Sequence, residues 1–239
     1  MPAMDGATSR EPSFLVQLAQ HAERSPDKVA VRVLADDGSE RECWSYAQLA
    51  QAVERTAHTL AARVPAGERV LLLLPTGLDY IASFLGCFGA GVCAVPAYPP
   101  ESAAAHAQRV VAIAKAARPR LVLAEPAHAE ATAQRMAAFG VRAPTLSLSA
   151  LWRSAPEADL QPMVARPHWP EPHELALLQY TSGSTALPKG VMVTHANLVA
   201  NQTAITQAFG MGPDDVIVSW LPLYHDMGLR GSLLQALYA

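Results

Sequence analysis

The chain has 239 residues, enough for one large domain or two ordinary ones, and 51% of them are hydrophobic, so a sizeable core can form. Its formal net charge is −3 and it has no basic block that could neutralise a phosphate backbone, which argues against nucleic acid as a partner. The cysteines, Cys43, Cys87 and Cys93, lack CxxC spacing, which argues against a disulfide framework or a thiolate zinc site and favours a reducing, cytoplasmic location.

The N-terminal region carries no sign of export. Residues 1–12 lack a positive stretch followed by a long apolar one, so we predict no secretion signal and expect a flexible N-terminus. The longest apolar run, 81–97, is interrupted by glycines and by Pro96 and falls short of the ~20 apolar residues that a membrane helix needs. The sequence therefore predicts no membrane span.

The first elements alternate between helical and strand patterns. Apolar side chains recur at helical spacing over 13–24, and residues 29–34 have the pattern of a strand. The Asp-Gly pair at 37–38 is a hairpin signal. Ser45 opens the sequence Ser-Tyr-Ala-Gln, which has the form of a capping box, so a helix is expected over 45–63.

A continuous apolar run at 70–74 begins a strand–helix–strand rhythm. Such a run suits a strand that is covered on both faces, as in a parallel sheet. A helix over 76–89, with Thr76 and Asp79 as its possible caps, leads to a strand over 92–97. The rhythm continues with helices predicted over 102–117 and 125–139 and strands over 120–124 and 145–148. This alternation predicts an α/β fold.

Prolines interrupt the pattern between residues 152 and 173, where they exclude a long helix or a central strand. Beyond them the sequence predicts strands over 175–180, 190–194 and 216–220, a helix over 196–209 and a further helix from Met227 onward. We therefore expect four regions: a flexible N-terminus (1–12), a first α/β subdomain (13–151), a proline-rich connector that crosses between two sheets (152–173), and the start of a second α/β subdomain (174–239).

A polar loop joins the first two strands that follow the connector. It contains Thr-Ser-Gly-Ser-Thr at 181–185, and its backbone amides and short hydroxyl side chains could donate hydrogen bonds to phosphate oxygens. A Walker-type loop would need Gly before the lysine and Ser or Thr after it, whereas Pro188 precedes Lys189 and Gly190 follows it. The alternative is a solvated surface loop carrying an ordinary lysine, which is common for this composition.

Three stretches carry a resemblance to a known family. Thr-Ser-Gly-Ser-Thr followed at fixed spacing by Pro-Lys-Gly-Val (188–191) resembles the phosphate loop of the adenylate-forming superfamily, which contains acyl-CoA synthetases, adenylation domains and luciferases. The family usually has Gly where this chain has Ala186, and a positive φ there would cost about 1 kcal/mol. SWLPLYHDMGL (219–229) and LPTGLDY (74–80) with VPAYPP (95–100) resemble the fatty acyl-AMP ligase branch.

The resemblance implies both a fold and a reaction. The fold would be stacked, mostly parallel sheets with flanking helices, forming the first part of the large N-terminal domain of an adenylate-forming enzyme. In the reaction a fatty carboxylate attacks the α-phosphorus of ATP, and the resulting acyl adenylate is passed to an acyl carrier protein or a polyketide or peptide synthetase module. ATP and Mg²⁺ are implied, with the magnesium ligands outside this chain.

The resemblance also assigns roles to individual residues. Lys189 is implied to face the β- and γ-phosphates and, with His225, to act in catalysis; Tyr224 and His225 are implied to contact the acyl substrate. Asp226 could orient the imidazole or cap the next helix, and we favour the cap. The nucleotide-binding set implied by the motif is Thr181, Ser182, Gly183, Ser184, Thr185 and Lys189.

Two alternatives stay open at this point. An acyl-CoA ligase would share these motifs, and a short non-catalytic protein could keep the loop for phosphate binding or docking. The pattern stops without a Gly or Pro at its end, so we expect the N-terminal portion of a longer ligase. Because the nucleoside-binding segments and the adenylation lysine of the family would follow Ala239, the isolated chain is expected to have little or no ligase activity.

Overall fold

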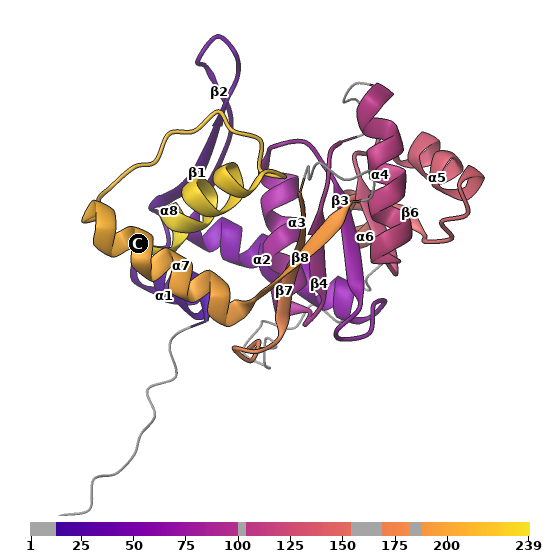
Figure 1. The fold of residues 1–239 in the computed structure, drawn as a ribbon. Coiled ribbons are helices and arrows are strands. Elements are labelled where there is room, and N and C mark those ends of the chain that lie inside the picture. The colour runs from indigo at the N-terminus through magenta and orange to yellow at the C-terminus, as the bar shows by residue number, and fades with distance from the viewer. Residues whose placement is uncertain (1–12, 100–103, 154–168, 182–187) are drawn as a thin grey trace, which may run out of the picture.

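A six-stranded sheet forms the centre of the computed structural model, which describes residues 13–99, 104–153, 169–181 and 188–239 (Figure 1). Five strands are parallel, and only the last, at one edge, runs antiparallel to its neighbour. The predicted mostly parallel α/β fold is confirmed. Across the sheet the order is β6 (Thr145–Leu146), β5 (Leu121–Ala124), β3 (Arg69–Leu73), β4 (Cys93–Pro96), β7 (Leu175–Thr181) and β8 (Lys189–Thr194).

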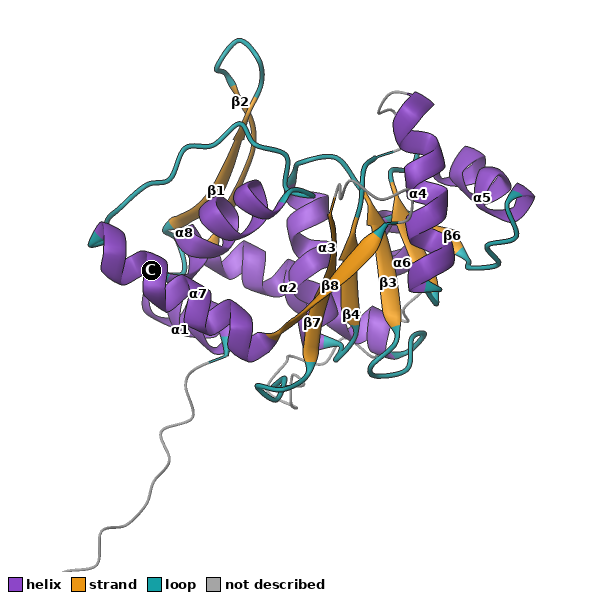
Figure 2. Cartoon of the chain, viewed as in Figure 1, coloured by secondary structure: helices purple, strands orange, loops and turns teal. Residues whose placement is uncertain are grey.

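Helices cover both faces of this sheet (Figure 2). Side chains alternate along β3, so that Leu72 enters one core while Leu71 and Leu73 enter the other. The second core is closed by α4 (Ala104–Ala117) and α5 (Ala129–Ala138). The first and larger core is closed by α1 (Phe14–Arg24), α2 (Tyr46–Ala61), α3 (Leu78–Gly89), α6 (Leu148–Arg153), α7 (His195–Phe209) and the C-terminal helices η2 (Met227–Leu234) and α8 (Gln235–Tyr238).

Two local signals in the sequence act as predicted. The Ser45 hydroxyl accepts from the Gln48 backbone N–H at 3.3 Å, and the Gln48 side chain accepts from the Ser45 N–H at 2.9 Å, which completes the capping box of α2. β1 (Val29–Leu34) and β2 (Glu40–Ser45) form an antiparallel hairpin, and Gly38 in its turn has φ of 81°, a conformation that glycine adopts without strain. No helix in the described part of the chain has both the length and the apolar character needed to cross a bilayer.

The predicted side-chain caps of α3 are wrong. The helix begins at Leu78 with Gly77 as its N-cap, and neither Thr76 nor Asp79 caps it. Instead a carboxylate oxygen of Glu42, on β2, accepts from the Leu78 backbone N–H at 3.4 Å. The cap thus comes from another element, which local sequence spacing could not indicate.

The connector does not lead to a second sheet, contrary to expectation. β7 pairs in parallel with β4, with Ala94 opposite Leu177, and so extends the same sheet. The physical reason is burial, because Ala94 and Leu177 are both fully buried in the first core. Pairing β7 with β4 gives the backbone groups of both strands hydrogen-bond partners and at the same time buries the apolar side chains of β7. Residues 154–168 of the connector lie outside the described residues, and the four-region division remains a prediction.

The strand predicted over 216–220 is also absent. Within the described residues this segment joins no sheet, and Val216, Val218 and Trp220 are 85%, 79% and 90% exposed. An alternating apolar pattern indicates a strand only if another strand lies beside it to receive its hydrogen bonds. None of the described strands does so here.

Close packing of α2 against α3 yields the first prediction. A Cβ added to Gly86 would lie 2.5 Å from Cγ2 of the buried Thr56. Exposed helix positions gain stability from a Gly-to-Ala change, but here we expect Gly86→Ala to lower the free energy of unfolding by about 1–3 kcal/mol through overpacking. Urea denaturation measures it. Gly212→Ala, with nothing within 4 Å of the added Cβ, is the control, and an equal effect of both substitutions would contradict this account.

Candidate active site

Two motifs that are far apart in the sequence meet at one edge of the sheet. Because β4 and β7 are parallel neighbours, their carboxyl ends lie at the same edge, where open α/β sheets bind ligands. β4 ends at Pro96, two residues before Tyr98, and β7 ends at Thr181, where the polar loop begins. The carboxyl edge of the sheet therefore carries both the aromatic motif and the predicted phosphate loop.

The structure describes the two ends of that loop. Thr181 is paired directly with Lys189 across the β7–β8 ladder, and both residues are exposed. The remaining predicted nucleotide-binding residues, Ser182, Gly183, Ser184 and Thr185, lie outside the described residues. The Thr181 hydroxyl and the Lys189 ammonium group thus belong to neighbouring residues at the two ends of the loop.

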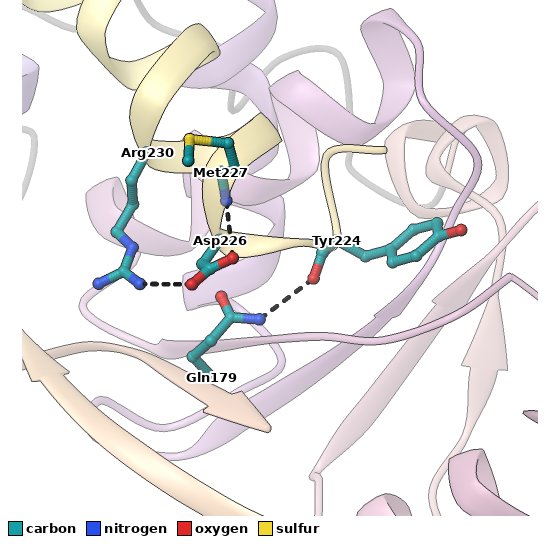
Figure 3. Close-up of polar contacts among 5 residues, drawn as sticks. All are labelled: Gln179, Tyr224, Asp226, Met227 and Arg230. Atoms are coloured by element: carbon teal, nitrogen blue, oxygen red, sulfur yellow. Dashed lines mark hydrogen bonds and ion pairs between the residues drawn. The ribbon is translucent and has the colours of Figure 1, made fainter. Parts of the chain in front are cut away.

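The turn that precedes His225 is held by two buried side chains, Tyr80 and Gln179, and by the exposed Thr76. The Leu223 backbone N–H donates to the Thr76 hydroxyl at 3.2 Å, and the Tyr80 hydroxyl donates to the Leu223 carbonyl at 2.8 Å. The Gln179 side-chain amide, on β7, donates to the Tyr224 carbonyl at 3.1 Å (Figure 3). Three side chains, one just before α3, one within it and one on β7, therefore set the path of this backbone.

Two tyrosine rings lie beside the predicted catalytic imidazole of His225. The Tyr98 ring lies 5.0 Å from the Tyr224 ring and meets the His225 ring edge-on at 5.8 Å, while the Tyr224 and His225 rings are 5.1 Å apart. The Arg109 guanidinium lies over Tyr98 at 5.5 Å. Burial, with Tyr98 as a smaller cause, raises the pKa of the Tyr224 hydroxyl, so it stays protonated at neutral pH and can donate a hydrogen bond. His225 itself is exposed.

Asp226 acts as a helix cap, as predicted. Its Oδ1 accepts from the Met227 backbone N–H at 2.8 Å, and its Oδ2 lies 3.4 Å from the Arg230 guanidinium (Figure 3). The helix that it starts, η2, is a π-helix, a form that occurs often at functional sites. Because 216–220 forms no strand, His225 lies in the turn before η2 and not at the end of a strand.

Gly228 allows this turn to close. A Cβ at that position would lie 2.4 Å from the Pro222 carbonyl oxygen, a backbone atom that cannot move aside cheaply. The His225 N–H donates to the same carbonyl at 3.0 Å. The glycine that follows His-Asp-Met in the motif is thus explained by close approach of the backbone.

Four site residues were not assigned from the sequence: Thr76, Tyr80, Tyr98 and Gln179. The first three lie in stretches that carry the family resemblance but could equally be packing residues. The signal for Gln179 was weaker, a single polar residue within the apolar strand Leu-Ala-Leu-Leu-Gln-Tyr. Only the structure shows that these side chains reach the turn.

Two thiols, Cys87 and Cys93, are buried and belong to the core. Burial raises the pKa of Cys93 to about 12 and that of Cys87 further, so both are protonated at neutral pH. His195 packs edge-on against Phe88 at 4.7 Å and belongs to the core. Among the described residues no three His, Cys, Asp or Glu side chains gather closely enough to hold a metal ion.

Comparison with known proteins identifies the family. The family described as AMP-binding enzyme matches residues 18–239. The chain belongs to this family. The predicted membership of the adenylate-forming enzymes is therefore confirmed, and the similar proteins include several that are named as fatty-acid ligases.

One curated relative and two solved structures illustrate that similarity among the AMP-binding enzymes. The medium-chain-fatty-acid–[acyl-carrier-protein] ligase JamA of Moorena producens is 36% identical over 74% of this chain and 30% of its own length. The crystal structure of a fatty acid AMP ligase from Legionella pneumophila superposes with a TM-score of 0.81 at 34% identity, covering 99% of this chain and 40% of that one. A second Legionella structure, a fatty acyl-adenylate ligase in complex with acyl adenylate and pyrophosphate, gives 0.79 at 34% identity, over 96% of this chain and 38% of that one. The chain thus spans less than half the length of these relatives.

Tyr80 provides the second prediction. Its hydroxyl is fully buried and donates to the Leu223 carbonyl, so Tyr80→Phe leaves that carbonyl without its donor. We expect a loss of about 1–3 kcal/mol in the free energy of unfolding, measured by chemical denaturation. Tyr46→Phe is the matched control, because the Tyr46 hydroxyl has no hydrogen bond within the described residues. If the two changes cost the same, the Leu223 contact does not stabilise the turn.

Proposed function

We propose that the chain is the N-terminal portion of a fatty acyl-AMP ligase, which activates a fatty acid with ATP to an acyl adenylate. The observation that carries the proposal is the arrangement at the sheet edge. The root of the phosphate loop and the turn bearing His225 lie at one edge, joined by the hydrogen bond from Gln179 to Tyr224. The names of the relatives support the same chemistry, since they include fatty-acid ligases and a complex with acyl adenylate and pyrophosphate.

The loop residues would stabilise the departing pyrophosphate. Negative charge grows on the β- and γ-phosphates as the bond to the α-phosphorus breaks, and preorganised donors lower the barrier by neutralising it. Lys189 supplies the positive charge, with Thr181 opposite it and Ser182, Gly183, Ser184 and Thr185 completing the proposed set. An exposed lysine at the root of the loop fits this role because it can reach a bound nucleotide without burying its own charge.

The turn residues would bind and orient the acid. Tyr98 and Tyr224 provide an aromatic surface beside His225, which suits an uncharged acyl chain, while the imidazole would orient the carboxylate against the α-phosphate. An amino-acid substrate would need a carboxylate for its ammonium group. The nearby Asp226 is already engaged, by the Met227 N–H and by Arg230, which favours a fatty acid over an amino acid.

The metal and the acyl acceptor are finer parts of the proposal. Magnesium would accompany ATP, but the described residues offer no cluster of ligands for it, so we assign none. We propose an acyl carrier protein or a synthetase module as the acceptor, supported by relatives named as acyl-carrier-protein ligases. Other relatives are named putative fatty-acid–CoA ligases, so coenzyme A is the competing acceptor.

A cytoplasmic location is proposed, because ATP is available there and the free thiols stay reduced.

The isolated chain is proposed to lack turnover. It spans 30–40% of the relatives' lengths, and phosphate contacts alone cannot assemble a transition state that also needs the nucleoside and the acid to be fixed. Robust adenylation by residues 1–239 alone would contradict this statement without affecting the family assignment.

Lys189 gives the third prediction. The test uses the full-length product of the gene. There we expect Lys189→Ala to lower fatty-acid-dependent ATP–pyrophosphate exchange by about 10²–10³-fold, which is the usual effect of removing one donor that stabilises charge in the transition state. Lys115→Ala, on the exposed side of α4, is the control and should exchange like the wild type. Exchange that depends on amino acids rather than fatty acids would overturn the proposed substrate class. Product analysis with coenzyme A or an acyl carrier protein distinguishes the acceptors.

A further inference from the structure

We infer that Gln179 is a positioning residue that couples the end of β7, where Thr181 lies opposite Lys189, to the turn bearing His225. The inference rests on the function proposed above, because it concerns the geometry of that same site. Gln179 lies on β7, two residues before Thr181, and only 7% of it is exposed. It is therefore part of the sheet core and close in sequence to the loop.

The direction of the Gln179 side chain follows from the strand. Its neighbours Leu178 and Tyr180 pack toward the second core, so Gln179 points to the opposite face, where the turn lies. There its Nε2 donates to the Tyr224 carbonyl at 3.1 Å (Figure 3). The amide can be oriented only one way, because a carbonyl oxygen accepts hydrogen bonds and cannot donate them.

The choice of residue also points to a role beyond packing. A buried amide side chain gains less from burial than an aliphatic one, and Leu177, two residues earlier on the same face of β7, is apolar and fully buried. An aliphatic residue at 179 would enlarge the core but would leave the Tyr224 carbonyl without its donor. The amide therefore serves the turn.

The other contacts to the turn come from a different element. Thr76 and Tyr80, just before and within α3, hold Leu223, whereas Gln179 holds Tyr224 from the strand that leads into the loop. A displacement of the end of β7 would thus be transmitted to the residue next to His225. Coupling of this kind would hold the fatty acid carboxylate and the α-phosphate of ATP in the position that the reaction needs, and a misplacement of about 1 Å can cost 10²-fold in rate.

Gln235 provides a matched control. Like Gln179 it is buried, its Nε2 donates one hydrogen bond, to the Thr206 hydroxyl at 2.8 Å, and its Oε1 has no partner among the described residues. It lies in α8, away from the loop and the turn. Gln179→Met and Gln235→Met therefore each remove a buried amide and its one hydrogen bond. Only Gln179 contacts the turn that bears His225.

The test measures fatty-acid-dependent ATP–pyrophosphate exchange in the full-length product of the gene. We expect Gln179→Met to lower kcat by about tenfold or more with little change in KM for ATP, and Gln235→Met to keep the wild-type kcat despite a similar loss of thermal stability. Equal kcat values for the two variants would overturn the inference. Loss of exchange in Lys189→Ala with wild-type exchange in Gln179→Met would leave the proposed function intact and reject only the coupling.

Gln179→Glu adds a readout that a merely structural role would not move. A carboxyl group can donate to the Tyr224 carbonyl only when protonated, and burial favours the protonated form. The ratio of the variant's kcat to that of the wild type should therefore rise as the pH falls. A ratio independent of pH would count against the hydrogen bond as the cause.

A final measurement is independent of the substrate. Hydrogen–deuterium exchange should show faster exchange at residues 223–229 in Gln179→Met than in Gln235→Met, because the turn has lost a contact from β7. Faster exchange there, in a protein that adenylates no fatty acid, would support the positioning and reject the proposed substrate. Unchanged exchange would reject the positioning itself.

Discussion

The parallel pairing of β4 with β7 is the constraint on which the site depends. It is carried by a short contact, Ala94 opposite Leu177, with both side chains fully buried. Parallel neighbours end at the same edge, so this pairing places Tyr98 and Thr181 together although the proline-rich connector separates them in sequence. If β7 had joined a different sheet, the end of β7 that leads into the proposed phosphate loop and the aromatic motif would not share an edge.

The turn that bears His225 derives its shape from elements around it. Between the end of α7 and the start of η2 the chain has no regular structure, so its backbone groups must find partners elsewhere. Thr76, Tyr80 and Gln179 provide them at Leu223 and Tyr224. Tyr80 and Gln179 are fixed in the packed core, whereas Thr76 is exposed, so two of the three contacts come from rigid surroundings, as a precise site requires.

Sequence signals predicted those features well whose hydrogen bonds and backbone conformation depend on residues close together in the chain. The capping box at Ser45, the hairpin glycine at Gly38 and the Asp226 cap all formed as expected, because each depends on residues within one turn of chain. Predictions that required a distant partner were less successful. The strand at 216–220 has no described neighbour, and the α3 cap came from Glu42 on β2.

The sequence by itself determined the family, the α/β rhythm, and the candidates Thr181, Lys189, Tyr224 and His225, because motif spacing and side-chain chemistry are written along the chain. Only the tertiary structure decided that one sheet receives strands from both sides of the connector, and that Gln179 and Tyr98 reach the turn. The physical reason is that strand pairing and buried hydrogen bonds join residues that have no regular separation in sequence. Their partners are chosen by which arrangement covers the most apolar surface while leaving buried polar groups satisfied.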